Sequence, residues 1–262
     1  MFLIDSHAHL DGDDFKDDLD DVLERANESG VKLIVNIGAT DGFSGAERSL
    51  LLAEKYEQIW CTVGIHPHDA KIPVDKAKLI ELAKRNKVRA IGETGLDFFK
   101  EWSPKADQEK WFRTQIEIAH ELSLPLVIHS RDASAECLAI LKEMEAEKVG
   151  GVFHCFPESA AFAEKLAAIN FLVSFPGIVT FPKATNVQEA AKNIPLQQIM
   201  LETDAPYLSP VPFRGKRCES AYVLQIAKKI AELKNISLEE VAKQTTKNAL
   251  NFYQIPADEL KR

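Results

Sequence analysis

Short apolar runs alternate with amphipathic helical patterns along the whole chain. The runs are nearly continuous in Val, Ile, Leu and Phe, which is typical of parallel strands that are covered on both faces. They occupy Phe2–Asp5, Lys32–Ile37, Ile59–Gly64, Arg89–Gly92, Leu126–His129, Gly151–His154, Phe171–Phe175 and Ile199–Glu202. The pattern therefore predicts eight short strands separated by longer segments.

The segments between the runs have the period of amphipathic helices. Apolar residues recur at steps of three and four in 15–26, in 112–119 and in 224–231. The last helix is expected to begin at the capping box Ser237-x-x-Glu240 and to turn Phe252 inward. Each predicted strand is followed by a helix, and one extra helix ends the chain.

This alternation favours one fold class. Eight β–α units with right-handed crossovers close a TIM barrel of about 250 residues, and the chain has 262. An open doubly wound sheet is the alternative, but no G-x-G-x-x-G follows the first run. We predict an α/β fold, a single (β/α)8 TIM barrel, with residues 1–262 forming one domain.

Composition places the chain among ordinary globular proteins, with 45% hydrophobic and 27% charged residues. No apolar run approaches the roughly 20 residues of a membrane helix, and the N-terminus lacks signal-peptide features. The cysteines show no C-x-x-C spacing. We expect a soluble, reduced, cytoplasmic protein with no membrane contact and no obligate protein partner.

The net charge of −8 restricts nucleic-acid binding. A protein that holds duplex DNA by bulk electrostatics usually carries a basic face. Any nucleic-acid role must therefore depend on a local basic cluster or on metal ions.

Polar residues gather where the predicted strands end. Catalytic residues of a TIM barrel stand at the C-terminal rim of the strands. The side chains there that suit a metal are His7, His9, Glu93, His129, His154 and Asp204. A lone histidine at a strand end is more often structural, but the joint placement of four histidines and two acids at one rim indicates a metal centre.

Six nitrogen and oxygen ligands exceed one tetrahedral zinc site and suit two divalent ions that share a carboxylate. We assign His7, His9 and Glu93 to one ion, and Glu93, His129 and His154 to the other. Four imidazoles favour Zn, Mn, Ni or Co over Mg, but the sequence does not select the metal.

Asp204 is placed near the first ion and near the water between the two ions. There it could accept the proton of the attacking water, which would make Asp204 and Glu93 the catalytic residues. The alternative is an Asp cap of the following segment, which Pro206 would also suit.

Further rim residues could contact substrate. His66 could touch a phosphate or be a satisfied loop histidine, and His68 is expected to face solvent. Arg131, Arg214 and Lys216, together with the neighbouring Arg217, could bind phosphate oxygens or pair with nearby acids.

The roles of three aromatic residues and of two further acids are left open by the sequence. Phe98, Phe99 and Trp102 could stack bases of a single strand, although packing within the loop is the more common outcome. Asp5 and Glu202 are expected to accept imidazole N–H groups.

The motifs together resemble the TatD-type metal-dependent hydrolases, which are often described as deoxyribonucleases. The resemblance extends over nearly the whole chain, through D-S-H-A-H-L-D, V-G-I-H-P-H, I-G-E-T-G-L-D, L-V-I-H-S-R-D-A, H-C-F and L-E-T-D-A-P-Y-L-x-P. It implies the barrel, the two-metal site with the same six ligands, and hydrolysis of phosphodiesters with DNA as substrate. One departure is visible: the family pattern R-G-K-R-N-E-P has Cys218 and Ser220 in place of Asn and Pro, which leaves the shape of that loop open.

Two other functions compete with a nuclease. A binuclear amidohydrolase that cleaves C–N bonds of small cyclic amides also has His-x-His on strand one. Such enzymes typically bridge their metals with a modified Lys at the end of strand four, where this chain has Glu93. A non-catalytic protein that binds metal or nucleic acid is the third possibility, but open coordination positions favour catalysis.

Overall fold

The computed structural model describes residues 1–261. Over this range, eight parallel strands form one sheet in the order β1 to β8. The strands are β1 (Leu3–Ala8), β2 (Val31–Gly38), β3 (Ile59–Val63), β4 (Val88–Asp97), β5 (Leu126–Arg131), β6 (Gly151–Phe153), β7 (Phe171–Phe175) and β8 (Ile199–Leu201).

A helix follows each strand, and a second helix follows the last strand. The helices are α1 (Leu19–Glu28), α2 (Phe43–Lys55), α3 (Lys76–Ala83), α4 (Lys105–Leu122), α5 (Ser134–Glu143), α6 (Ala160–Ala167), α7 (Thr185–Asn193), α8 (Val223–Lys234) and α9 (Leu238–Phe252). The sequential strand order and the strict alternation of strand and helix confirm the predicted α/β barrel fold.

The chain divides into two compact units. The first comprises residues 1–36, 155–167 and 172–261, and the second comprises residues 37–154 and 168–171. That residues 1–262 form one domain stays a prediction. None of the helices within residues 1–261 is both long and apolar enough to cross a membrane.

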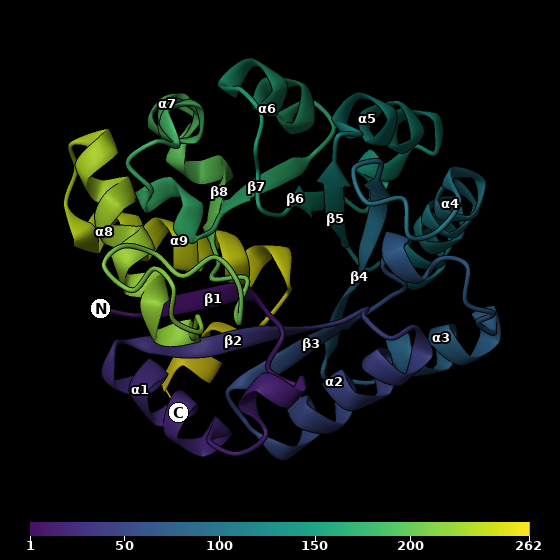
Figure 1. Ribbon diagram of the computed structural model, residues 1–262, viewed down its shortest axis with the longest axis horizontal. Coiled ribbons are helices and arrows are strands. Elements are labelled where there is room, and N and C mark those ends of the chain that lie inside the picture. The colour runs from purple at the N-terminus through teal and green to yellow at the C-terminus, as the bar shows by residue number, and fades with distance from the viewer. Residues whose placement is uncertain (262) are drawn as a thin grey trace. The chain divides into compact units, whose positions relative to one another are not determined.

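In the first unit, β1 pairs with the start of β2, and α1 lies beside them (Figure 1). Ala8 at the end of β1 also pairs in parallel with Ala205, just beyond β8. The first and last strands are therefore neighbours, as the barrel fold requires. At the start of α9, the Ser237 hydroxyl accepts the N–H of Glu240 at 3.1 Å, which is the predicted cap.

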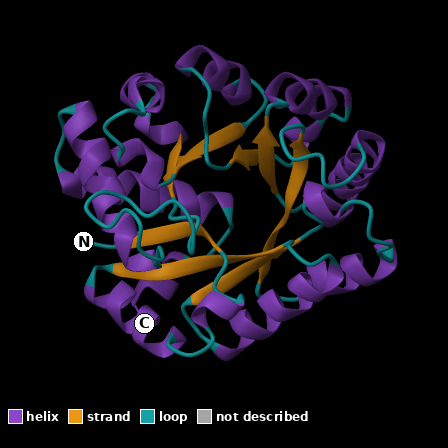
Figure 2. Ribbon diagram, in the orientation of Figure 1, coloured by secondary structure: helices purple, strands orange, loops and turns teal. Residues whose placement is uncertain are grey.

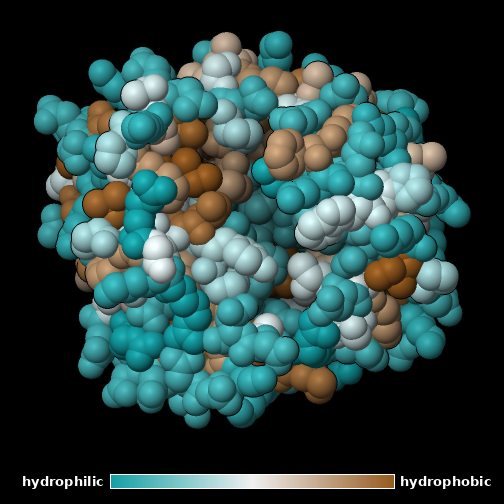
Figure 3. All heavy atoms as spheres, viewed as in Figure 1, coloured by the Kyte–Doolittle hydropathy of each residue, from teal (hydrophilic) through white to brown (hydrophobic). Residues whose placement is uncertain are grey.

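In the second unit, α2 to α5 lie on the outer side of the strands (purple and orange in Figure 2). The strand residues Val63, Ile91, Val127 and Ile128 are fully buried, as expected of strands covered on both faces. The surface drawn in Figure 3 is mostly hydrophilic, with hydrophobic residues in small groups.

Several boundaries differ from the prediction; β1, for example, ends at Ala8 rather than at Asp5. Strand β4 does not end at Gly92 but continues to Asp97, because it keeps pairing with β5 after a register shift. Glycine and polar residues interrupt the apolar run there, so the hydrophobic pattern ends before the strand does. Phe15, predicted to lie in the first helix, belongs to a separate 3-10 turn (Asp13–Phe15), which buries its ring.

Candidate metal centre

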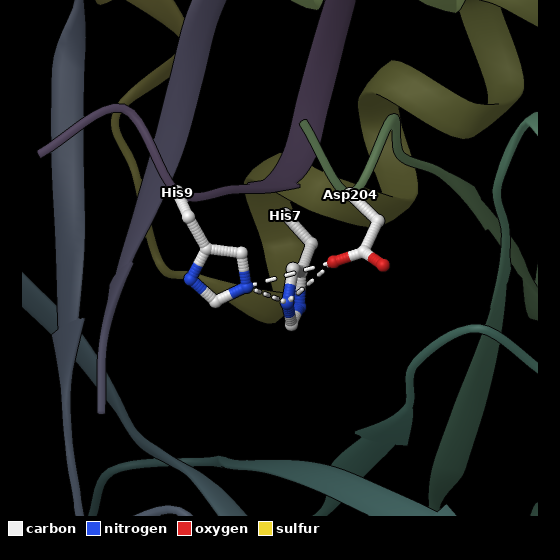
Figure 4. Close-up of side chains that lie close together, drawn as sticks. All are labelled: His7, His9 and Asp204. Carbon is white, nitrogen blue, oxygen red and sulfur yellow. Dashed lines mark hydrogen bonds and ion pairs between the residues drawn. The ribbon is translucent and has the colours of Figure 1, made fainter. Parts of the chain in front are cut away.

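The first unit brings His7, His9 and Asp204 together. Nε2 of His7 lies 3.3 Å from Nε2 of His9, and Oδ1 of Asp204 lies 3.6 Å and 3.5 Å from these two atoms (Figure 4). One ligand atom from each residue lies within 4.8 Å of the others. His7 is buried, and the other two side chains are 12% and 14% exposed. Two imidazoles and a carboxylate converging on one point suit a divalent cation.

Backbone hydrogen bonds hold this triad together. The N–H of Asp204 donates to the His7 carbonyl at 2.9 Å, and the N–H of His9 donates to the Ala205 carbonyl at 2.7 Å. Asp204 has φ +58°, a conformation that Asp tolerates better than most residues. The turn after β8 is thereby attached to the end of β1, which orients the carboxylate toward the two rings.

The buried carboxylate of Asp5 supports the same turn. It accepts the backbone N–H of Thr203 at 2.8 Å and the Thr203 hydroxyl at 2.6 Å. Among residues 1–261 its bonds go to Thr203 and to the backbone of His7 rather than to an imidazole, unlike the prediction. Burial raises the pKa of Asp5 to about 7. Glu202 accepts the Cys155 N–H and the Ser174 hydroxyl, and its predicted imidazole contact stays a prediction.

The second unit surrounds the buried carboxylate of Glu93 with three imidazoles. Oε1 of Glu93 lies 2.6 Å from Nε2 of His154, 2.8 Å from Nδ1 of His129 and 3.5 Å from Nε2 of His66. Burial opposes the charge of Glu93, but the nearby His154 and His66 and the hydrogen bonds of His129 and His154 hold its pKa well below the usual range. A buried anion that faces several ring nitrogens is a chemical environment suited to a cation.

Two glycines allow β4 to carry Glu93 close to β5. Gly92 and Gly95 have φ of +143° and +135°. A Cβ atom at position 95 would lie 2.1 Å from the carbonyl oxygen of His129, and one at position 92 would lie 2.6 Å from that of Val127. Both positions therefore require glycine, for conformation and for space.

Asp97 is a residue of this cluster that the sequence interpretation missed. Its Oδ2 lies 3.1 Å from Nε2 of His129 and 2.7 Å from Nε2 of His68. Burial would raise the pKa of Asp97, but the hydrogen bonds with His129, the Lys100 N–H and His68 outweigh it and lower the pKa. His68, only 20% exposed, does not face solvent as predicted. The signal was available: Asp97 follows Glu93 by four residues, which in a strand returns to the same face.

His129 therefore lies between two carboxylates. Its burial alone would lower the pKa of the ring, but the hydrogen bonds with Asp97 and Glu93 raise the pKa overall. An ionised Asp97 can only accept, so Nε2 of His129 carries a proton. Glu93 is ionised as well, so a protonated ring donates to both carboxylates. A cation held by Glu93 would replace the proton on Nδ1, while the hydrogen bond from Nε2–H to Asp97 remains. This carboxylate–histidine arrangement is the one that metal-ligating histidines usually show.

His66 lies in the same cluster with the opposite tautomer. Its Nδ1 accepts the backbone N–H of His68 at 3.1 Å. Burial lowers the pKa of His66 to about 4, so the ring is neutral at neutral pH. The proton of the neutral ring is therefore on Nε2, the atom facing Glu93. Nε2 of His66 also belongs to a group, with Glu93 and His129, whose ligand atoms lie close enough together to hold a metal ion.

The rim cations divide into two groups. Arg217 pairs with both oxygens of Asp18 at 2.8 Å and 2.6 Å, which is the alternative that the sequence left open. Arg131 and Arg214 instead lie over the rings of Phe99 and Phe181 at 3.9 Å and 4.2 Å.

Lys216 is the third cation of the second group, with Nζ 6.0 Å from the Phe213 ring. Among the residues described, Arg131, Arg214 and Lys216 form no ion pair with a carboxylate. Cys218, which replaces the Asn of the family pattern in the same loop, is fully buried. Its backbone N–H donates to the Pro206 carbonyl at 3.0 Å.

Comparison with known proteins identifies the family. The family described as TatD related DNase matches residues 4–254. An uncharacterized metal-dependent hydrolase of Bacillus subtilis, YabD, is 44% identical over 255 residues, which cover 97% of this chain and 99% of the relative. The 3'-5' ssDNA/RNA exonuclease TatD of Salmonella typhimurium is 32% identical over 260 residues, 97% of this chain and 99% of that protein.

A solved structure shares the fold along almost the entire chain. The TatD homologue YjjV of Escherichia coli K12 aligns with a TM-score of 0.90 at 27% identity, covering 97% of this chain and 98% of that one. Together with the clusters around His7 and Glu93, these matches confirm the resemblance seen in the sequence motifs. The chain belongs to the TatD family and is a metal-dependent hydrolase.

Proposed function

We propose that this protein hydrolyses phosphodiester bonds of nucleic acid, with DNA as its substrate, using two divalent cations. The observation that carries the proposal is the buried Glu93 carboxylate with histidine nitrogens of His129 and His154 at 2.8 Å and 2.6 Å. The separate triad of His7, His9 and Asp204 supports a second cation position. The name of the Salmonella relative, a 3'-5' ssDNA/RNA exonuclease, supports this choice of substrate class.

The six ligands are assigned as the sequence suggested. His7, His9 and Glu93 would hold one ion, with Asp204 beside it, and Glu93, His129 and His154 would hold the other. Divalent cations held there would polarise a phosphoryl oxygen and lower the pKa of water. The donors fit Zn, Mn, Ni or Co, and Mg is the less favoured alternative.

The remaining side chains act directly on substrate. Asp204 accepts the proton of the attacking water, because it is the partly exposed carboxylate beside the two histidines of the first unit. His66 donates its Nε2–H to a phosphate oxygen, which its tautomer allows. Arg131, Arg214 and Lys216 bind phosphates, since no carboxylate among the residues described pairs with them.

A substrate panel tests this function. The purified protein is loaded with Mn²⁺, Mg²⁺ or Zn²⁺ and offered single-stranded DNA, a simple phosphodiester and a cyclic amide. We expect turnover of both phosphodiesters and none of the amide. His7→Ala should abolish turnover, whereas Lys148→Ala, which breaks an exposed pair with Glu145, should not. Turnover of the amide alone would overturn the proposal, and metal binding without turnover would favour the non-catalytic alternative.

A further inference from the structure

The segment after β4 exposes two aromatic rings close together in sequence. Phe99 is 55% exposed and Trp102 is 57% exposed. Most large aromatic side chains bury their rings, and contiguous exposed apolar area commonly marks a binding site. We call the group of Phe99, Lys100, Trp102 and Arg131 the aromatic–cation surface.

Positive charge accompanies both rings. The guanidinium of Arg131 lies 3.9 Å from the centre of Phe99, and Nζ of Lys100 lies 5.8 Å from Phe99 and 5.4 Å from Trp102. The neighbouring acid, Glu101, pairs with Lys105 at 3.2 Å. In a chain of net charge −8, two cations beside two exposed rings favour a ligand that is both aromatic and anionic.

The surface is continuous with the metal cluster of the second unit. The ring of Trp102 lies 4.4 Å from that of His68, which lies 4.3 Å from His66 and 5.9 Å from His129. One imidazole therefore separates the exposed indole from a candidate metal ligand.

Asp97 also holds the segment in place. Its Oδ1 accepts the backbone N–H groups of Phe99 and Lys100 at 3.1 Å and 2.8 Å, while its Oδ2 lies beside the ring of His129. The exposed rings are thus presented by a backbone that is tied to the cluster, which reduces the entropy lost on binding.

We propose that the aromatic–cation surface binds unpaired bases of a single-stranded nucleic acid next to the phosphodiester that is cleaved. Bases stack on Trp102 and on the Phe99–Arg131 pair, and Lys100 contacts phosphate. A duplex is excluded because its bases already stack on one another. This inference rests on the proposed function and adds the subsite that holds the unpaired bases.

Binding without cleavage tests the surface separately from the reaction. Metal-free protein in excess chelator is titrated into labelled oligo-dT or oligo-U of about ten nucleotides, and anisotropy gives Kd. Trp102→Ala should weaken binding of either oligomer about 5- to 150-fold, as expected for the loss of one stacked base. Trp102→Phe should restore most of the affinity. Phe2→Ala removes another exposed ring, 44% exposed at the start of the chain, and should change nothing.

Salt dependence tests the cations. Lys100→Ala should lower the slope of log Kd against log salt by about 0.7, the value for one phosphate contact on a single strand. Thermal melting checks that each variant is folded, and Phe99→Ala replaces Trp102→Ala if the latter is not.

The outcomes separate the two proposals. Unchanged affinity in the folded Trp102 or Phe99 variant, or equal binding of a blunt duplex, would overturn the inference even if the enzyme cleaves DNA. Loss of affinity in the Trp102 variant together with no turnover of any phosphodiester would refute the proposed function and leave the binding surface intact.

Discussion

The carboxylate of Asp97 lies 3.1 Å from Nε2 of His129, on the edge of the ring opposite to Glu93. With a cation held by Glu93, the hydrogen bond of Nε2–H to Asp97 leaves Nδ1 as the nitrogen that can bind it. Because Oδ1 of Asp97 is occupied by the N–H groups of Phe99 and Lys100, the acid cannot rotate without losing both bonds. Orientation and tautomer of one candidate ligand thus depend on a residue that is not itself a ligand in our assignment.

Asp97→Asn should lower metal affinity about 10- to 100-fold. The amide oxygen would stay with the two backbone donors, so its NH2 group would face His129 and the ring proton would move to Nδ1. Metal titration gives the affinity, and 15N NMR of the metal-free, neutral ring reports the tautomer. Asp13→Asn, at a position 94% exposed, is the control. An unchanged tautomer in the Asp97→Asn variant would contradict the explanation.

Glu93→Ala should abolish both metal binding and activity. The substitution removes the carboxylate that lies beside the rings of His129 and His154. In our assignment the same carboxylate is a ligand of both ions. Metal content per chain, measured by elemental analysis, is the direct check. The matched variant Glu117→Ala, which breaks an exposed pair with Lys76, should bind metal normally. Two metals retained by an active Glu93→Ala variant would eliminate the bridging role.

Arg214→Ala should weaken the use of substrate and leave metal content unchanged. The guanidinium lies over the ring of Phe181 without an ion pair among the residues described, so the loss is expected to be one phosphate contact. The measurement is KM for single-stranded DNA together with metal content. Arg217→Ala is the comparison, because Arg217 is already paired with Asp18 and should affect substrate less. A fall in metal content of the Arg214→Ala variant would show that its loop has been misassigned.

Gly95→Ala should lower the free energy of unfolding by roughly 1–3 kcal/mol. The added Cβ would meet the carbonyl oxygen of His129 and would also hold Ala at φ +135°. Gly215→Ala separates the two causes, because Gly215 has φ +85° but nothing within 4 Å of a Cβ. Urea denaturation should show the larger loss at position 95. Equal losses at both positions would mean that the contact with β5 contributes nothing.

The sequence predicted much of this structure because its strongest signals are local. Buried parallel strands are apolar runs, so β3, β5 and β7 could be placed within two residues of their observed bounds. Their C-terminal ends then identified the metal-binding candidates, of which His7, His9 and Asp204 lie together, and His129 and His154 lie beside Glu93.

What the sequence did not reveal depends on contacts between distant segments. The extension of β4 follows from pairing with β5 across two glycines, which carry no hydrophobic signal. The inward position of His68 depends on Asp97, 29 residues away. The cytoplasmic location and the single domain stay predictions, since local pattern alone supports them.

The bond from the His68 amide to Nδ1 of His66 has an evolutionary consequence. The donor belongs to the main chain, so every residue except proline at position 68 would supply it. A mutation of the ring at position 68 would remove its bond to Asp97 but would leave the proton of His66 where it is. The tautomer of His66 is therefore set by the backbone of residue 68 and does not depend on the side chain at that position.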